Sequence, residues 1–415
     1  MTSENAQKAI ERLLAHAPLQ KLFRALSGEE IRVVGGAVRN ALIGAEIADI
    51  DIAAAALPQV IAEKAGKAGL RVVPTGVEHG TLTLVFDGTH FEVTSLREDV
   101  ETDGRRAKVR FGRDFAADAL RRDFTVNALS IDADGRLYDY TGGLEDLAAR
   151  RIRFIGAPEK RIAEDFLRIL RFFRFSASFG EGPLDAAGLE ACIALRAGLA
   201  HLSRERLGAE TLKIFAAKRA AFVIQAMSGA GLLSYLHVAP WPVRLWRLAA
   251  ILAARKTADP LLALASLALH SEADAEILGE GLRLSKLQKR RLADMARVYA
   301  VWHGLAAPPE PGLLREALFL HGAPAARDAL ALVEAESSVA PDDPGFARAD
   351  AFLRDTPRPK APFAASDLLA RGLAPGAELG EALKRLQALW IRAGFPQEPQ
   401  IVANLIDEAR ASIGG

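Results

Sequence analysis

Two aspartates stand two residues apart a short distance after a double glycine. Residues 35–52 read GGAVRNALIGAEIADIDI, which contains Asp49 and Asp51. On a β-strand, residues i and i+2 point to the same face and lie about 6–7 Å apart. Two carboxylates at that spacing repel each other unless a cation lies between them, and Mg²⁺ prefers such hard oxygen ligands. The pair therefore predicts a magnesium site for phosphoryl or nucleotidyl transfer. The alternative is a solvated pair on an edge strand.

A third carboxylate and a phosphate cradle would complete such a site. Glu92, in HFEVT, is the best positioned candidate to reach the aspartates from a neighbouring strand, and Glu78 is the second. Either could instead be a surface residue. Gly35 and Gly36 lead directly into a helix, where the backbone can approach an anion closely and free N–H groups can bind it. Arg39, one turn later, can add a charged donor to a phosphate. A tight turn without a ligand is the other interpretation of the double glycine.

Residues 121–128, RRDFTVNA, combine two cations and an anion with a nonpolar run. The structural interpretation is a helix start, with Asp123 as the cap, both arginines in solvent, and Phe124 and Val126 in the core. The functional interpretation is a polar pocket in which Arg122 and Asp123 contact a ligand. Taken alone, the segment leaves both interpretations open.

A third cluster lies in EDFLRILRFFRF, residues 164–175. At about 100° per residue, Arg168, Arg171 and Arg174 share one arc of a helix, and Asp165 lies at its edge. The opposite arc carries Phe166, Ile169, Leu170 and Phe173. An ordinary amphipathic helix with an Asp–Arg pair would give the same pattern.

Asp165 and Arg168 could also recognise a base. Together they offer an acceptor and donors, which complement cytosine and adenine. Uracil and guanine present the opposite pattern, and a site that would leave buried polar groups unpaired rejects such ligands. The pair could therefore select C and A without a nucleic-acid template.

The elements around these residues predict an α+β protein. In the N-terminal third, strand patterns (IRVVGG, ADIDIA, RVVPTG, TLTLVFDG, HFEVTSLR) alternate with helical ones, which indicates a small mixed sheet. Residues 99–114 are charged and contain glycine, and they predict a long flexible loop. A helix is expected to resume over 115–131. Beyond Gly142 the chain is helical, and the proline-rich residues 339–364 are expected to separate a helical body from a tail.

Composition limits the function classes. A chain of 415 residues should form two to four compact units. Net charge is only +1, but basic residues predominate over 150–174, which is enough to bind phosphates. The single cysteine, Cys192, excludes a disulfide framework and a cysteine-based zinc site. With no long apolar run and no signal-like N-terminus, a soluble cytoplasmic protein without a membrane partner is expected. The absence of a His-Asp dipeptide disfavours an HD-type phosphohydrolase.

GGAVRN followed by DIDI resembles the signature of DNA polymerase β-like nucleotidyltransferases, in particular the CCA-adding enzymes and bacterial poly(A) polymerases of class II. RRDFTVNA, the EDxxR pattern at 164–168 and HLSRERLGAE (201–210) strengthen the resemblance, which covers about residues 30–215. It implies a catalytic nucleotidyltransferase head (1–150), a helical neck that recognises the base (151–215), a helical body (216–340) and a tRNA-binding helical tail (341–415).

The resemblance also implies residue roles. Asp49 and Asp51 would be catalytic and would bind Mg²⁺, and Gly36 and Arg39 would bind the nucleotide. Arg122 and Asp123 would contact the sugar and triphosphate while Asn127 braces the pocket. Asp165 and Arg168 would choose the base, Arg171 and Arg174 would bind triphosphate, and the loop at 99–114 would act in the switch to ATP. HLSRERLGAE is expected to have only a structural role.

The implied activity is addition of C, C and A to the 3′ end of tRNA from CTP and ATP, with release of pyrophosphate. Poly(A) polymerase, or an enzyme that adds only CC or only A, is the alternative within the family. A catalytically silent RNA-binding protein on the same fold is the alternative from another class.

Overall fold

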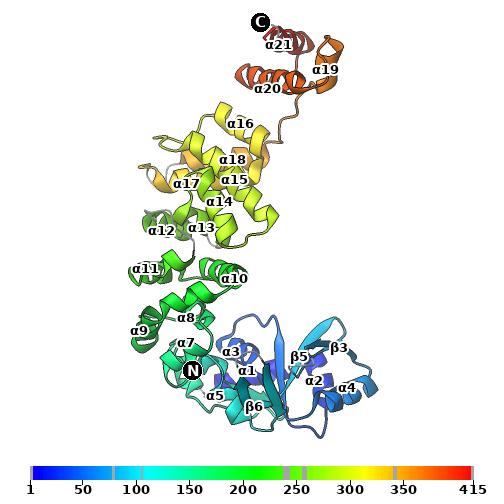
Figure 1. Ribbon diagram of the computed structural model, residues 1–415, viewed down its shortest axis with the longest axis vertical. Helices are drawn as coiled ribbons and strands as arrows, with labels where there is room; N and C mark the ends of the chain where they lie inside the picture. The colour runs from blue at the N-terminus through cyan, green and yellow to red at the C-terminus, as the bar shows by residue number, and fades with distance from the viewer. Residues whose placement is uncertain are drawn as a thin grey trace. The chain divides into compact units, whose positions relative to one another are not determined.

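A computed structural model describes residues 3–76, 80–103, 106–236, 244–254, 259–339 and 344–412. The chain forms two compact units, residues 1–235 and 236–415. The first contains a mixed sheet and helices, and the second is helical (Figure 1). The predicted α+β class is therefore confirmed, whereas the predicted division into four parts stays a prediction.

A seven-stranded sheet organises the first unit, in the order β3-β4-β5-β2-β1-β8-β9. Its strands are β1 (Ile31–Val34), β2 (Ile50–Ala54), β3 (Arg71–Gly76), β4 (Thr81–Phe86), β5 (Thr89–Ser95), β8 (Ser130–Asp132) and β9 (Leu137–Tyr138). Only β2 and β5 pair in parallel; the other pairs are antiparallel. The five strand patterns identified in the sequence correspond to β1–β5.

The alternation of residues along β4 and β5 gives the sheet two different faces. Leu82, Leu84, Phe91 and Val93 are buried in the core, whereas Glu92, on the opposite face, is exposed. Helices α1 (Ser3–Leu14), α2 (Ala17–Ala25), α3 (Gly36–Ile43) and α4 (Pro58–Lys67) complete this part of the unit. One face of β3, β4 and β5 thus remains available for a ligand.

The predicted loop at 99–114 is instead mainly a β-hairpin. Strands β6 (Arg97–Asp103) and β7 (Arg106–Phe111) form a separate two-stranded sheet, with an irregularity in register between Asp99 and Thr102. Gly104 and Arg105 lie outside the described residues. Charge and glycine content favoured a loop, but strand pairing is made by the backbone, and the alternation in KVRF (108–111) was the overlooked signal.

The helix expected over 115–131 is also wrong beyond its first turns. Helix α5 (Phe115–Leu120) is capped by Asp114, whose Oδ1 accepts from the backbone N–H of Ala116 at 2.8 Å, and it ends before the two arginines. Phe124 is extended and forms an isolated bridge to Phe154. The short 3-10 helix η2 (Thr125–Asn127) and β8 then follow. Burial of Phe124 outweighs the local helical pattern.

Helices follow from residue 143 onward in the first unit. These are α6 (Gly143–Ala148), α7 (Pro158–Glu164), α8 (Leu167–Ser178), α9 (Ala186–Ala194), α10 (Arg204–Phe215) and α11 (Ala220–Gly229). Asp165 has an extended backbone and separates α7 from α8, so the EDxxR pattern crosses a helix break. Ile169, Leu170 and Phe173 are fully buried, as the predicted apolar arc requires.

The second unit is built from α12 (Leu245–Ala254), α13 (Pro260–Ala268), α14 (Glu272–Gly281), α15 (Lys286–Trp302), α16 (Pro311–His321), α17 (Ala323–Glu336) and α18 (Pro344–Asp355). Helix α18 packs against α16 and α17, so the proline-rich segment 339–364 is not a simple separator. Pro344 is the first residue of α18, a position where the missing N–H costs nothing.

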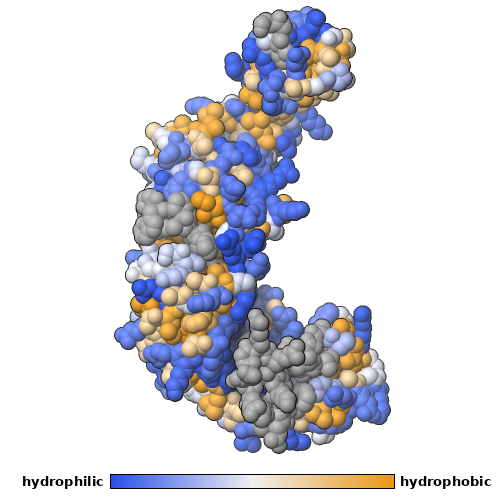
Figure 2. All heavy atoms as spheres, viewed as in Figure 1, coloured by the Kyte–Doolittle hydropathy of each residue, from blue (hydrophilic) through white to orange (hydrophobic). Residues whose placement is uncertain are grey.

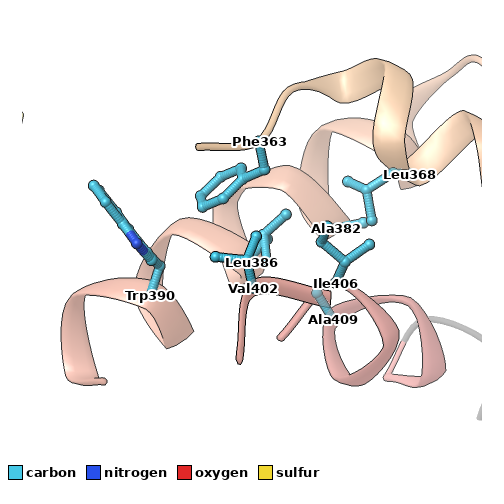
Figure 3. Close-up of a cluster of buried hydrophobic side chains, with 8 residues drawn as sticks. All are labelled: Phe363, Leu368, Ala382, Leu386, Trp390, Val402, Ile406 and Ala409. Atoms are coloured by element: carbon cyan, nitrogen blue, oxygen red, sulfur yellow. The ribbon is translucent and has the colours of Figure 1, made fainter. Parts of the chain in front are cut away.

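The last three helices share a small apolar cluster, against which Phe319 of α16 also packs. Helices α19 (Ala365–Ala370), α20 (Ala377–Arg392) and α21 (Pro399–Ala411) contribute Leu368, Leu386 and Ile406 to it, and Phe363 joins from the preceding segment (Figure 3). The indole N–H of Trp390 donates to the Pro396 carbonyl at 2.8 Å, so its polar atom is satisfied.

On the face of the molecule in view (Figure 2), the coloured apolar groups are interspersed rather than gathered in one band. Figure 2 shows hydrophilic residues with smaller hydrophobic areas between them. Among the described residues, no helix is both long and apolar enough to cross a membrane.

Candidate active site

The double glycine forms the turn between β1 and α3. Gly35 has φ +68°, a conformation that L side chains rarely adopt, and a Cβ there would lie 2.8 Å from Nη1 of Arg122. Gly36 is the first residue of α3. The turn therefore needs glycine at residue 35 to let the arginine approach the backbone, and it leaves the start of α3 beside a cavity.

The carboxylates lie across neighbouring strands. Asp51 is the second residue of β2, and Asp49 comes immediately before that strand. In the parallel pairing of β2 with β5, Asp51 lies opposite Glu92. All three residues line one cavity. Asp49, Asp51 and Glu92 are thus brought together at one edge of the open sheet face. Glu78, the second candidate for the third carboxylate, lies outside the described residues.

Like charges and desolvation act together on Asp51. Its side chain is exposed in part, yet neighbouring protein atoms still desolvate it. This partial burial and then the nearby Glu92 carboxylate raise the pKa of Asp51, Asp49 adds to the effect, and Arg122 opposes it. A cation would relieve this repulsion.

The donor set fits a magnesium ion better than an enclosed metal centre. Among the described residues, no group of three or more His, Cys, Asp or Glu side chains is arranged to hold a metal ion by itself. Mg²⁺ is usually held by one or two carboxylates together with waters and substrate phosphates. Asp49 and Asp51 meet that requirement, and Glu92 is close enough to influence Asp51 electrostatically.

A cavity of about 520 Å³ extends from Asp51 toward α8. Its polar lining comes from the glycine turn, the RRDF segment, α8 and α10: Gly35, Gly36, Asp51, Arg122, Asp123, Asn127, Asp165, Arg168, Arg171 and Arg206. The three motifs found in the sequence therefore surround one space. Its size and polar lining suit a nucleotide-sized ligand.

Asp123 and Arg122 have different partners. Oδ1 of Asp123 accepts from the Phe124 backbone at 2.9 Å and from Nδ2 of Asn127 at 3.0 Å, and Oδ2 accepts from Nε of Arg171 at 2.6 Å. Arg122 donates through Nη2 to Asp118 at 2.9 Å. Asp123 is thus buried as the link between α8 and the RRDF segment, rather than a helix cap.

Arg39 lies behind the cavity rather than in its lining. It is buried, its guanidinium donates to the Asn127 side chain and, at 2.9 Å, to Asn40, and it lies 4.1 Å from the ring centre of Phe179. Burial and then the charges of Arg174 and Arg171 lower the pKa of Arg39 to about 10, against the attraction of Asp123. These contacts suit a bracing role, and its predicted phosphate contact stays a prediction.

Asp165 and Arg168 line the cavity but do not pair with each other. Oδ1 of Asp165 accepts from the Leu167 backbone at 3.0 Å, and Oδ2 accepts from Nη2 of Arg206 at 2.7 Å. Arg168 donates to the Arg161 carbonyl at 2.7 Å and to Glu164. Each member of the proposed base-selecting pair is therefore held by another residue.

Arg174 points away from this lining. Its Nε lies 2.8 Å from Oε2 of Glu210 on α10, and burial lowers its pKa. Of the three arginines on the predicted arc, Arg168 and Arg171 line the cavity, while Arg174 joins α8 to α10. Its predicted contact with triphosphate stays a prediction.

Two further residues of this region, Arg206 and Asp118, were not singled out by their sequence context. Arg206 lies in the segment that was expected to have only a structural role, and its contact with Asp165 spans 41 residues. Asp118 orients Arg122 from one helical turn earlier. The i,i+4 spacing could have revealed Asp118, whereas no local signal identifies Arg206.

Two family models match the chain. Residues 31–153 match the "Poly A polymerase head domain", and residues 184–240 match the "Probable RNA and SrmB- binding site of polymerase A". The first match covers the sheet and the RRDF segment, and the second includes α10 with Arg206.

Among curated relatives, the chain is 38% identical over 268 residues to the mitochondrial CCA tRNA nucleotidyltransferase 1 of Danio rerio. The matched segment covers 63% of this chain and 61% of that protein. It is 45% identical over 188 residues to the human protein of the same name, covering 45% of this chain and 43% of that protein. The chain thus spans about two to three fifths of the length of these relatives.

Among solved structures, the CCA-adding enzyme of Bacillus stearothermophilus in complex with CTP superposes with a TM-score of 0.71 and 26% identity, over 99% of both chains. The Thermotoga maritima CCA-adding enzyme with tRNA gives a TM-score of 0.67 at 17% identity, over 97% of this chain and 98% of that one. The second likeness shows the fold alone.

Proposed function

Because the chain belongs to the family of tRNA nucleotidyltransferases and poly(A) polymerases, we propose that it adds C, C and A to the 3′ end of tRNA. The substrates are CTP, ATP and a tRNA without its CCA end, and no nucleic-acid template is used. One observation carries the proposal: a single cavity joins Asp51 to Asp165 and Arg168. It connects a carboxylate suited to nucleotidyl transfer with a polar pair suited to choosing C and A.

The reaction exchanges a phosphoanhydride bond of the nucleotide for a phosphodiester bond to the RNA. The 3′ oxygen of the RNA bonds to the α-phosphorus, the bond from that phosphorus to the β-phosphate oxygen breaks, and pyrophosphate leaves. The hydroxyl proton passes to solvent. The chain orients the reactants: the glycine turn and start of α3 receive phosphates, and Arg122 and Arg171 offer charged donors.

Asp49 and Asp51 would hold the magnesium ion. When bound, Mg²⁺ supplies positive charge that favours ionisation of the RNA hydroxyl and neutralises the phosphates. Removal of the repulsion among Asp49, Asp51 and Glu92 would favour its binding at this edge. Because Glu92 acts on Asp51 at short range, it would tune the affinity even without ligating the ion.

Base choice would depend on how Asp165 and Arg168 are held. Arg206 and the Leu167 N–H fix the Asp165 carboxylate, and Glu164 and the Arg161 carbonyl fix Arg168. A fixed acceptor and a fixed donor complement cytosine and adenine, whereas uracil and guanine would leave polar groups unpaired. Arg206 and Glu164 thus act as positioning residues.

The purified protein can be tested on three RNA substrates, namely tRNAs that lack the last three, two or one nucleotides, each with one nucleoside triphosphate at a time. CTP should be used by the first two and ATP by the third. Repeated ATP addition to any RNA would indicate a poly(A) polymerase instead. Use of only CTP or only ATP would indicate a partial enzyme, and RNA binding without pyrophosphate release would indicate a silent binding protein.

The compartment stays the prediction made from the sequence, a cytoplasmic one. The relatives from Danio rerio and human carry mitochondrial names. Detection of the tagged protein in fractions of its own cell would test this.

A further inference from the structure

A second cavity opens on the other side of Asp51. It has a volume of about 700 Å³ and lies over the open face of β2, β5, β4 and β3. Its polar lining consists of Asp49, Asp51, Glu92, His90, Thr83 and Arg71. Asp51 is the one lining residue that it shares with the cavity of Asp165 and Arg168.

The open face of β2, β5, β4 and β3 forms the floor of this cavity, and the strand register explains which residues lie on it. One row crosses the sheet from Asp51 to Glu92, Thr83 and Val73, which are successive partners on neighbouring strands. The adjacent row runs from His90 to Val85 and Arg71. Because strands lie about 4.8 Å apart, Arg71 on β3 is about 14 Å across the sheet from β2.

Charge is unevenly distributed along this floor. The carboxylates of Asp49, Asp51 and Glu92 gather at one end, where they repel an unshielded phosphate. Arg71 lies at the other end and is exposed, and no ion pair joins it to another of the described residues. His90 is on β5, two residues before Glu92, so it lies beside the carboxylates and offers a ring nitrogen there. The partly buried Val73 and Val85 give the floor an apolar part.

In-line displacement requires the attacking oxygen and the leaving group to lie on opposite sides of the phosphorus. A nucleotide in the first cavity, with its α-phosphate near Asp51, occupies one of these sides. The attacking hydroxyl must then approach from the other side, where the second cavity opens.

We propose that the second cavity binds the 3′-terminal nucleotide of the RNA acceptor, with Arg71 contacting a backbone phosphate and His90 positioning the terminal sugar. This rests on the proposed function. The floor fits a terminal nucleotide whose hydroxyl reaches the carboxylate end, whose sugar or base lies over Val73 and Val85, and whose phosphate reaches Arg71.

Arg71→Ala tests the phosphate contact by steady-state kinetics with a tRNA acceptor. We expect the KM for RNA to rise about tenfold, because a hydrogen bond between charged groups is lost, while the KM for CTP stays unchanged. The slope of log KM against log salt concentration should fall by about 0.7, the value for one phosphate contact on a single strand. Arg71→Lys should bring both the KM for RNA and the salt slope most of the way back to their wild-type values.

Lys67→Ala is the matched control, because it removes one exposed positive charge from α4 of the same unit, outside both cavities. It should leave both KM values and the salt slope at their wild-type levels. An unchanged KM for RNA in Arg71→Ala, or an equal rise for CTP, would overturn the proposed subsite. Inactive wild-type and Lys67→Ala proteins would instead overturn the proposed function.

Cross-linking can locate the 3′ end of the bound RNA without any need for nucleotide transfer. An acceptor RNA with a photoreactive 3′-terminal base is irradiated with the wild-type protein, and the modified peptides are identified by mass spectrometry. Cross-links to β3, β4 or β5 support the subsite, and His90→Ala should weaken them. Cross-links confined to α8 or α10, or none to the head strands, would overturn it.

Discussion

The two units use arginine in different ways. In the first unit, Arg171 and Arg206 are each paired with one carboxylate at the edge of an open cavity, with side chains 32% and 48% exposed. In the second unit, the Arg247 side chain is completely buried. The residue type is the same, but the first two arginines are partly exposed beside a cavity and Arg247 is enclosed by protein.

The N–H donors of Arg247 are taken up by acceptors within the second unit. Arg247 donates to the main-chain carbonyls of Ala265 and Leu269, at 3.0 and 2.7 Å, where α13 ends. It also donates to Glu336 of α17 at 2.7 Å. Tyr299 of α15 also accepts from Arg247, at 3.2 Å, and donates to Glu336 at 2.8 Å. Four helices are thereby joined through one buried network.

The contrast separates arginines that bind from arginines that support the fold. A guanidinium has five N–H donors, and one carboxylate uses only part of them. Arginines that line a cavity and keep part of their surface exposed can therefore donate to a ligand's phosphates. Arg247 instead has its donors taken up by carbonyls, Tyr299 and Glu336. Changes in the first unit should accordingly affect activity, and changes in the second should affect stability.

Asp51→Asn should give the largest effect. We expect nucleotide transfer to fall on the order of a thousandfold, because the charge that holds the metal is lost. The melting temperature should stay equal or rise slightly, since repulsion from Glu92 is relieved. Initial rates of CMP incorporation and thermal unfolding check this, and Asp49→Asn should also abolish transfer. A rate within a few fold of wild type would remove the metal-site assignment.

Arg247→Met should have the largest effect on stability. Loss of the guanidinium leaves the buried carbonyls of the α13 end without their donor and removes one partner of Glu336, which keeps Arg244 and Tyr299. The second unit should therefore lose about 3 kcal/mol. Denaturant unfolding measures the loss, while the transfer rate per folded molecule at low temperature should remain near wild type. Adding Glu336→Gln should recover part of the stability. If transfer chemistry fell before unfolding began, the division between the units would be wrong.

Arg206→Ala should loosen base selection without abolishing transfer. With Asp165 no longer fixed, incorporation of UMP or GMP should rise about tenfold relative to CMP and AMP. Asp165→Ala and Arg168→Ala should loosen selection further, and Arg204→Ala, at the start of the same helix, is the control. Competition between nucleotides on matched tRNAs measures the ratio. Full discrimination in all three site variants would refute base selection by the protein.

Shortening the β6–β7 hairpin should change the rate of A addition and the rate of C addition to different extents. Removal of the pairs Thr102–Ala107 and Asp103–Arg106 should impair A addition several fold more than C addition, if the hairpin acts when the site changes from CTP to ATP. Rates on tRNAs ending before the first C and before the final A give the comparison. Equal losses would assign the hairpin only to the fold, and a loss confined to C addition would reverse its role.

Glu336→Gln should give the smallest effect, which depends on pH. Burial opposes ionisation of Glu336, but the hydrogen bond from Tyr299 and the charges of Arg247 and Arg244 outweigh it and lower its pKa below the usual 4.5. Its ionised form therefore stabilises the fold above that pH, and the contribution is lost as pH falls through the lowered value. The melting-temperature gap between wild type and variant should shrink on acidification, whereas the exposed Glu381→Gln should show little gap at any pH.

Local geometry explains what could be predicted from the sequence. The spacing of Asp49 and Asp51 depends only on the short segment where β2 begins. The arc of Arg168 and Arg171 depends on one turn of helix, so neither pattern needs a distant partner. The glycine turn and strands β1–β5 were likewise identified by short-range patterns. The hairpin at 97–111 was missed because its charged composition concealed a backbone pairing.

Tertiary structure decided which residues meet. Arg171 and Asp123 are 48 residues apart, and Arg206 and Asp165 are 41 apart, so no local period links them. Asp165 and Arg168, neighbours in the sequence, are held by different partners because the helix breaks at Asp165. The sequence alone determined which groups could perform the chemistry. Only the packing of α8 and α10 beside the sheet decided their orientation, because burial and long-range pairing fix a side chain that local structure leaves free to rotate.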